Sequence, residues 1–242
     1  MLKKINKLCI IISIIYIFFI IFNLNGYCLE PKVLNKKEIK YYVKEQMSNY
    51  KNEIIFYYNG NDIKNWLKED VLSYYNLGEL NYYNYDGCKI YYTYYPDTTL
   101  VKLNINYKVS KKQMKYVNKH ITKIAKRCKA NTKIKTIKNV NNYFKRNLTY
   151  ETSQNSIYIG LKNKKGNCYT YSILTYLTLN KLGIKNNTVY GTVNNGEHIW
   201  NKVKINNKWK YLDVTYNDYL NNKYFLMNKN QISKTHIEKI RN

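Results

Sequence analysis

Residues 168–180 contain no charged side chain, although charged residues make up 23% of this chain of 242 residues. Their sequence, CYTYSILTYLTLN, puts apolar residues on most sides of a helix, which is typical of a helix buried in a protein core. Gly183 follows, and glycine commonly ends helices. We therefore predict a buried helix over 168–182, with these residues facing inward: Ile173, Leu174, Tyr176 and Leu177.

Cys168 lies in the first turn of this predicted helix, two residues after Gly166. Free N–H groups and the helix dipole stabilise a thiolate at a helix N-terminus. Gly166 lets the chain turn sharply and lets a substrate approach the backbone. The alternative interpretation is a structural core thiol, but such a cysteine more often lies in the middle of a helix. Cys168 is therefore a candidate nucleophile.

The segment after this helix predicts a β-hairpin whose register follows from its turn. Asn206 and Asn207 tolerate the positive φ angles of a two-residue turn. His198 and Asp213 then lie on one face as diagonal neighbours, about 7–8 Å apart at the backbone and within side-chain reach. A three-residue turn would separate them by face. The predicted pairs are Ile205–Lys208, Trp200–Asp213 and His198–Thr215.

A cysteine nucleophile needs a base to generate its thiolate and a third group to fix the tautomer of that base. We expect Asp213 to accept the Nδ1–H of His198, so that Nε2 faces the sulfur of Cys168. Taken alone, His198 and Asp213 each have a structural interpretation as hairpin residues. Their coincidence with a cysteine at a helix start predicts thiol chemistry.

These segments resemble the core of the transglutaminase-like superfamily, which shares a papain-like arrangement. The resemblance covers about residues 132–228 and includes 223–228 as a closing strand. It implies that Cys168 is the nucleophile, His198 the base and Asp213 the orienting acid. The matching pieces, in order, are a Gly-x-Cys helix start, Leu-Gly-Ile, Val-x-Gly, His-x-Trp-Asn and Trp-x-x-x-Asp-Val-Thr.

The predicted fold class is α+β. A papain/transglutaminase-like core at 131–242 has its buried nucleophile helix packed on an antiparallel sheet, and a mixed α/β extension at 29–130 precedes it. The extension gives no catalytic signal of its own. Its predicted helices are 35–51, 61–76 and 111–130, and its predicted strands are 53–60, 88–95 and 99–109. A core helix is predicted at 132–147, with these apolar residues at helical spacing: Ile134, Ile137, Val140 and Phe144.

The first residues predict an export signal. Three lysines precede an apolar run at 8–22, and small residues follow at Gly26 and Cys28. The run is short for a membrane span, which needs about 20 residues. We expect a signal peptide over 1–28 and a secreted or cell-surface protein. The alternative is an uncleaved N-terminal anchor, which would be the only contact with a membrane.

The formal net charge is +26, from 41 Lys and Arg against 15 Asp and Glu. Lysine is scattered along the chain and arginine is rare, and a bias toward AT-rich codons explains such an excess as well as function does. Nucleic-acid readers favour clustered arginine, so no nucleic acid is expected as a partner. Anionic wall polymers, membrane surfaces or acidic proteins suit an exported basic protein better.

The cysteine and histidine counts limit metal and disulfide chemistry. Cys88 and Cys128 accompany Cys168 after the signal, and an odd number of cysteines predicts a reactive thiol beside a pair that can form a disulfide. The sequence fixes no distance between Cys88 and Cys128. It has no CxxC motif, and its histidines are His120, His198 and His236, so neither a metal nor another cofactor is expected.

The expected function is acyl transfer on peptide or isopeptide amides of a protein or peptide substrate. We favour hydrolysis, because transfer to a lysine amine needs a dry tunnel that the sequence does not reveal. The Cys168 N–H is expected to bind the oxyanion, with Asn167 or Tyr150 as a second donor and Trp200 as a wall of the acyl site. The alternatives are a transglutaminase, a non-catalytic cell-surface module with the same fold, and a polymer- or nucleic-acid-binding protein.

Overall fold

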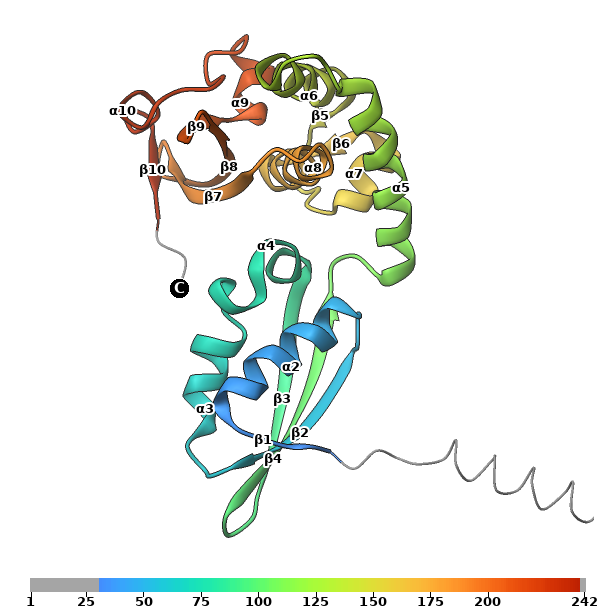
Figure 1. Cartoon of the computed structure of the whole chain (residues 1–242), viewed down its shortest axis with the longest axis vertical. Coiled ribbons are helices and arrows are strands. Elements are labelled where there is room, and N and C mark those ends of the chain that lie inside the picture. Colours follow the sequence, from blue (N-terminus) through green and yellow to red (C-terminus); the bar gives the residue numbers. More distant parts are fainter. Residues whose placement is uncertain (1–30, 240–242) are drawn as a thin grey trace, which may run out of the picture.

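The computed structural model describes residues 31–239, which form an N-terminal and a C-terminal part (Figure 1). The predicted signal peptide at 1–28 lies outside these residues. Within 31–239, no helix is both long and apolar enough to cross a membrane.

The N-terminal part is built on a four-stranded sheet in the order β1-β2-β4-β3, in which only β1 and β2 pair in parallel. Val101, Leu103 and Ile105 alternate along β4 and are buried, as their spacing predicts. They pack with residues of the helix α2 (Lys36–Ser48) in one apolar cluster. The strands are β1 (Val33–Leu34), β2 (Glu53–Asn59), β3 (Tyr85–Tyr94) and β4 (Thr98–Tyr107).

The helices of this part are α2 (Lys36–Ser48), α3 (Ile63–Trp66) and α4 (Tyr74–Asn84), with a π-helical turn η1 (Leu67–Val71). The single helix predicted over 61–76 is therefore wrong. Ser73 has extended φ and ψ angles, and its side chain accepts a hydrogen bond from Asn76 N at 3.4 Å. Ser73 thus starts a new helix where the pattern predicted a continuous one.

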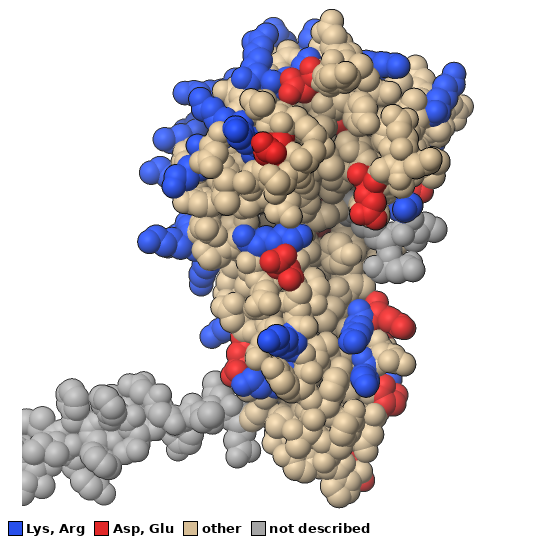
Figure 2. Space-filling model, turned by 180° about the vertical axis from the view of Figure 1, so that it is seen from behind, with Lys and Arg blue, Asp and Glu red and all other residues tan. Residues whose placement is uncertain are grey.

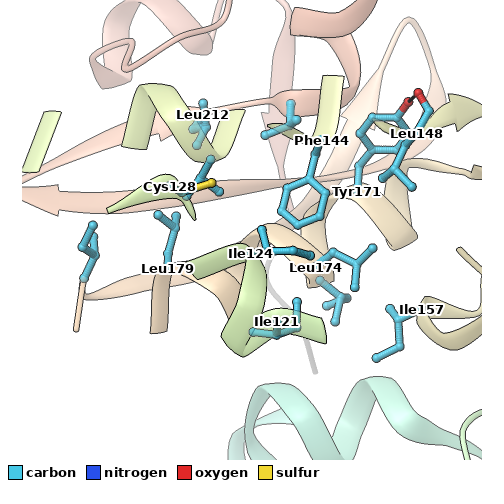
Figure 3. Close-up of a cluster of buried hydrophobic side chains, with 14 of the residues drawn as sticks. Ile121, Ile124, Cys128, Phe144, Leu148, Ile157, Tyr171, Leu174, Leu179 and Leu212 are labelled. Atoms are coloured by element: carbon cyan, nitrogen blue, oxygen red, sulfur yellow. Dashed lines mark hydrogen bonds between the residues drawn. The ribbon is translucent and has the colours of Figure 1, made fainter. Parts of the chain in front are cut away.

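Four helices form the main core of the C-terminal part: α5 (Lys111–Cys128), α6 (Lys133–Asn147), α7 (Ile157–Asn163) and α8 (Cys168–Lys181). The Ser110–Gln113 capping box is confirmed at the start of α5. Side chains from these helices and from β9 point toward one another in a continuous apolar cluster (Figure 3). On α6, Ile137, Val140 and Phe144 are buried, whereas Ile134 from the same apolar pattern is 51% exposed.

The predicted helix at 168–182 is confirmed as α8, which lies between the α5 helix and the second sheet (Figure 1). Gly183 ends it with φ of +70°. A helix buried on most sides and packed on an antiparallel sheet confirms the predicted α+β fold class. The second sheet has the order β10-β7-β8-β9 and contains β7 (Asn186–Val193), β8 (Gly196–Ile205), β9 (Lys208–Leu212) and β10 (His236–Glu238).

The predicted hairpin register is confirmed at the turn. Asn206 and Asn207 have positive φ angles, and Ile205 pairs with Lys208. The ladder ends at the Asn201–Leu212 pair, because α9 (Val214–Tyr219) starts immediately afterwards. The predicted pairs of Trp200 with Asp213 and of His198 with Thr215 are therefore absent from the ladder.

The predicted closing strand at 223–228 is also wrong. Met227 makes one isolated bridge to Tyr211, and a short helix α10 (Lys229–Ile232) follows. The strand that closes the sheet is β10, which pairs antiparallel with β7. A two-stranded parallel sheet of β5 (Thr149–Tyr150) and β6 (Lys165–Gly166) precedes α8.

Residues of helix α4 make hydrogen bonds to the C-terminal part. The Glu79 carboxylate accepts a hydrogen bond from Thr188 N of β7 at 2.8 Å. The Tyr169 hydroxyl of α8 donates to the Tyr83 carbonyl. These contacts hold the N-terminal part against the end of α8 that begins at Cys168.

The three cysteines within residues 31–239 are free thiols, so the disulfide considered for Cys88 and Cys128 is not present. Cys128 is buried in the helical cluster (Figure 3), whereas Cys88 is half-buried on β3. Burial raises the pKa of each of these two thiols to about 11. Both are therefore poor nucleophiles near neutral pH.

The net positive charge is distributed unevenly along the chain, although lysine occurs throughout it. Residues 31–97 contain nine lysines and nine acidic residues, so their formal charges cancel. Residues 98–150 contain 15 Lys and Arg and no acidic residue. Blue side chains gather along the edge of the upper part where α5 lies (Figure 2). Codon bias alone does not explain this zoning, because it would affect both segments.

Candidate active site

Cys168 is the first residue of α8. Asn167 caps the helix: its Oδ1 accepts from Thr170 N at 3.3 Å and its Nδ2 donates to Thr152 O at 3.2 Å. The first intrahelical bond comes from Tyr171 N to Asn167 O at 3.1 Å. The Cys168 N–H therefore has no acceptor one turn earlier within the helix. The half-buried Cys168 thiol thus lies at the positive end of a helix dipole.

Gly166 is required here for close packing, a reason that the sequence did not predict. Its φ angle is not in the left-handed region. A Cβ atom at this position would lie 2.5 Å from the Cβ of Thr170 on the first turn of α8. Since that separation is a clash, glycine lets β6 pass directly beneath the start of the helix.

His198 lies on β8 and is 7% exposed. Its Nε2 is 2.6 Å from Oδ2 of Asp213, within hydrogen-bond distance. The two side chains thus meet as their shared face predicts, but the predicted ring nitrogen is wrong. Asp213 bonds Nε2 instead of Nδ1, which leaves Nδ1 as the ring nitrogen available to the Cys168 thiol. Cys168 is close enough to His198 to raise its pKa, and the two residues line the same cavity.

Asp213 lies at the junction of β9 and α9 and is fully buried. Its Oδ1 accepts a hydrogen bond from Tyr216 N at 3.1 Å, so the residue also caps α9. One carboxylate oxygen is thereby committed to the helix and the other to the imidazole. These two hydrogen bonds fix the orientation of the buried carboxylate.

The charges at this site stabilise one another. Burial by itself raises the pKa of Asp213, but the nearby His198 charge and the hydrogen bonds from His198, His236 and Tyr216 hold it at about 2. Burial opposes a charge on His198, yet Asp213 and Cys168 raise the pKa of the imidazole to about 9. A buried carboxylate and a protonated imidazole therefore coexist near neutral pH.

His236 is a member of this cluster that the sequence reasoning missed. Its Nε2 lies 2.9 Å from the same Oδ2 atom of Asp213. It comes from β10, a three-residue strand with little sequence signal. The one available signal was its rarity, as one of three histidines in the chain.

His198, Asp213 and His236 place three ligand-type atoms within 4.8 Å of one another. Both ring nitrogens contact the same oxygen at 2.6 and 2.9 Å, which are hydrogen-bond distances. That pattern fits two N–H donors on one carboxylate better than three ligands arranged around an ion. The absence of a metal remains a prediction.

Cys168 and His198 line a cavity of about 1110 Å³ between the two parts of the chain. The N-terminal part supplies the opposite wall from η1, α4 and β3, including Lys68, Tyr82 and Cys88. A second cavity of about 570 Å³ also reaches His198 and is lined by Tyr150, Glu197, Tyr216, Asp218 and Tyr219, among others. The imidazole thus borders two openings.

The three residues with predicted supporting roles have different positions. Tyr150 is 50% exposed and lines the second cavity. Asn167 is engaged as the helix cap. Trp200 is 1% exposed and stacks on His198, with ring centroids 5.9 Å apart and planes 18° apart. Trp200 lines neither of the two cavities, so it supports the imidazole from behind.

Residues 122–214 match the profile of the transglutaminase-like superfamily. The match includes α8, the β8–β9 hairpin and the residues Cys168, His198 and Asp213. This segment belongs to the transglutaminase-like superfamily. No protein of curated function matches the sequence significantly.

Several solved structures resemble the chain at low sequence identity. A TGase has 14% identity and a TM-score of 0.41 and aligns with 77% of this chain, which spans 59% of the TGase. A protein from Cytophaga hutchinsonii, proposed to be a cysteine protease, has 11% identity and a TM-score of 0.39, with 64% and 67% of the two chains aligned. The periplasmic domain of TgpA from Pseudomonas aeruginosa, bound to ethylmercury, has 13% identity and a TM-score of 0.36, with 50% and 56% aligned.

Proposed function

We propose that this protein is a secreted thiol enzyme that cleaves peptide or isopeptide amides, with Cys168 as nucleophile, His198 as acid and base, and Asp213 as orienting carboxylate. The observation that carries the proposal is the 2.6 Å contact between the buried His198 and Asp213, beside a thiol at a helix start in one cavity. Burial raises the pKa of the other two described thiols, Cys88 and Cys128, to about 11, which makes them poorer nucleophiles.

The reaction begins with attack of the Cys168 thiolate on the amide carbonyl carbon, which moves the π electrons onto oxygen. The Cys168 N–H stabilises this oxyanion at the positive end of α8. His198 then donates its Nδ1 proton to the leaving amine as the C–N bond breaks, which leaves a thioester on Cys168. Water, deprotonated by His198, attacks the thioester, and the sulfur departs with its electron pair.

The large cavity supports a role for the N-terminal part, whose function the sequence did not indicate. The part of the cavity wall that it supplies carries Tyr82, Tyr83 and Lys108. Backbone and side-chain contacts from α4 to β7 and α8 hold that wall in place. We infer that the substrate polypeptide lies between the two parts, so that the N-terminal part selects the sequence that is cleaved.

Transfer to a lysine amine is the second candidate activity. The second cavity places Glu197 and Asp218 near His198 together with the rings of Tyr150, Tyr216 and Tyr219. Carboxylates and aromatic faces both attract an alkylammonium group. Hydrolysis remains the preferred activity because the large cavity is wide enough to admit water beside the thiol.

Incubation with casein, with and without a primary diamine, tests the proposal. Hydrolysis gives shorter fragments, whereas amine transfer gives heavier species and releases ammonia. Either product must disappear in Cys168→Ala and His198→Ala. Activity that survives in Cys168→Ala would contradict the proposal. So would equal alkylation rates of Cys168 in the wild type and in His198→Ala, the result expected for a non-catalytic binding module.

A further inference from the structure

The Asp213 carboxylate has two imidazole partners, and the proposed reaction uses only one of them. His198 Nε2 lies 2.6 Å and His236 Nε2 lies 2.9 Å from the same Oδ2 atom. His236 is 2% exposed, and its side chain is fully inaccessible. A second histidine in this position requires an explanation, because a buried polar ring is costly without a specific role.

The hydrogen bonds of His236 define its tautomer. An ionised carboxylate can only accept hydrogen bonds, so the His236 Nε2 must carry a proton. Its Nδ1 lies 2.8 Å from Oγ1 of Thr235. The same hydroxyl donates to the Ile232 carbonyl at 3.4 Å. With its N–H on Nε2 directed at Asp213 and the Thr235 hydroxyl at Nδ1, each ring nitrogen of His236 has a partner.

The surroundings of His236 prevent the ring from turning. Trp200 and Tyr224 contact it at centroid distances of 4.9 and 4.8 Å, and Tyr216 lies at 5.8 Å. The titratable groups that face it are Asp213, His198, Tyr216 and Tyr224, and Asp213 is the acidic one. The His236 N–H therefore has one acceptor with a fixed direction.

The strand that carries His236 is itself firmly placed. His236 pairs with Val193 and Glu238 with Gly191 across β10 and β7. A Cβ atom on Gly191 would lie 2.0 Å from the Ile237 carbonyl oxygen, so only glycine permits this approach. Glu238 also forms ion pairs with Lys202 and Lys229 at 3.2 and 2.7 Å. The C-terminal strand thus reaches the site in a defined register.

We propose that His236 is a positioning residue, which orients the Asp213 carboxylate and, through it, the His198 ring toward Cys168. This inference rests on the proposed thiol function. The Tyr216 N–H holds Oδ1, and the His236 N–H holds Oδ2 beside the contact with His198. With both oxygens fixed, the carboxylate stays ionised and presents one lone pair to His198 Nε2. The remaining nitrogen, Nδ1, is then directed at the sulfur.

The test measures the pH dependence of Cys168 alkylation by iodoacetamide, with peptide mapping, in the full chain. His236→Gln keeps an N–H near the Nε2 position, whereas His236→Phe keeps the ring and loses the donor. Thr235→Val leaves His236 in place but removes the hydroxyl that bonds its Nδ1 and helps to hold the ring. His120→Phe is the matched control, because His120 lies on α5 and stacks on Tyr116.

We expect His236→Phe to shift the alkylation profile upward by about one pH unit and to slow alkylation near neutral pH about tenfold, the effect of losing a hydrogen bond to a charged group. His236→Gln restores the profile to within about half a unit. Thr235→Val shifts it in the same direction by less, and His120→Phe leaves it unchanged. Melting curves by circular dichroism show which variants are folded.

Folded His236→Phe and Thr235→Val variants that both keep the wild-type profile would overturn the positioning role. If His236→Phe does not fold, Thr235→Val decides alone: a shifted profile supports the role and an unchanged one overturns it. Failure of the proposed function looks different. In that case Cys168 of the wild type itself reacts like an ordinary exposed thiol, and His198→Ala does not change its profile.

Discussion

Substitution of Asp213 by asparagine removes the charge of the buried carboxylate and keeps its shape. The asparagine side chain would retain an oxygen for the Tyr216 N–H, so the cap of α9 persists. Its amide nitrogen would face His198 Nε2 and could only donate a hydrogen bond. The imidazole must then place its proton on Nδ1, toward the sulfur, which is the wrong tautomer for a general base.

The size of the effect follows from the imidazole. The pKa of His198 is raised from 6.5 to about 9, a shift that corresponds to about 3 kcal/mol of preference for the charged ring. Without the carboxylate, burial is left to oppose that charge, and the pKa falls to or below its ordinary value. Together with the wrong tautomer, this loss predicts a decrease of about 10³-fold to 10⁴-fold in kcat/KM.

The same interaction sets the pH range of maximum stability. The contribution of His198 is complete below its unfolded pKa of 6.5 and is lost as the pH rises through about 9. The contribution of Asp213 is complete above 3.8 and is lost as the pH falls through about 2. Wild-type stability should therefore be greatest between about pH 3.8 and pH 6.5, where both contributions are complete. The stability of Asp213→Asn should depend less on pH.

Hydrolysis rates and urea unfolding, each measured across pH, test this prediction. Asp97→Asn is the matched control, because it removes the charge of an exposed turn residue. An Asp213→Asn variant that keeps its rate within about threefold of the wild type would refute the reasoning. So would a variant whose loss of rate is matched by Asp97→Asn.

Two further predictions concern stability. Gly191→Ala should destabilise the fold by at least about 2 kcal/mol, because the new Cβ would lie 2.0 Å from the Ile237 carbonyl oxygen. Urea unfolding measures this loss of stability. An equal loss in Gly196→Ala, where the new Cβ makes an ordinary contact of 3.5 Å, would contradict the prediction. Lys119→Glu should stabilise α5 by about 1 kcal/mol, because it turns two repulsive pairs, with Lys115 and Lys123, into attractive ones. Its gain in Tm should shrink with added salt, and a gain independent of salt would count against this explanation.

The part of the site built from local sequence could be predicted. The uncharged run located α8, and the Asn206–Asn207 turn fixed the hairpin register, so His198 and Asp213 were expected on one face. The choice between Nδ1 and Nε2 was predicted incorrectly because Asp213 leaves the strand as the cap of α9. Capping α9 changes the orientation of the Asp213 carboxylate, and the register of the hairpin does not predict that orientation.

The part of the site built from distant contacts could not be predicted. His236 approaches Asp213 through a strand of three residues that pairs with β7, more than 40 residues earlier in the chain. The apolar segment 223–228 was the stronger sequence pattern for a closing strand, yet it makes one bridge. Similarly, the contacts of Tyr83 and Glu79 that bring the N-terminal part to the cavity depend on tertiary packing alone.

Competition among the three described thiols for a limiting amount of iodoacetamide, near pH 6, tests the central claim most directly. The account predicts that Cys168 is modified first and almost alone, and that this selectivity vanishes in His198→Ala. Equal modification of Cys88, Cys128 and Cys168, or a selectivity that His198→Ala leaves intact, would contradict it.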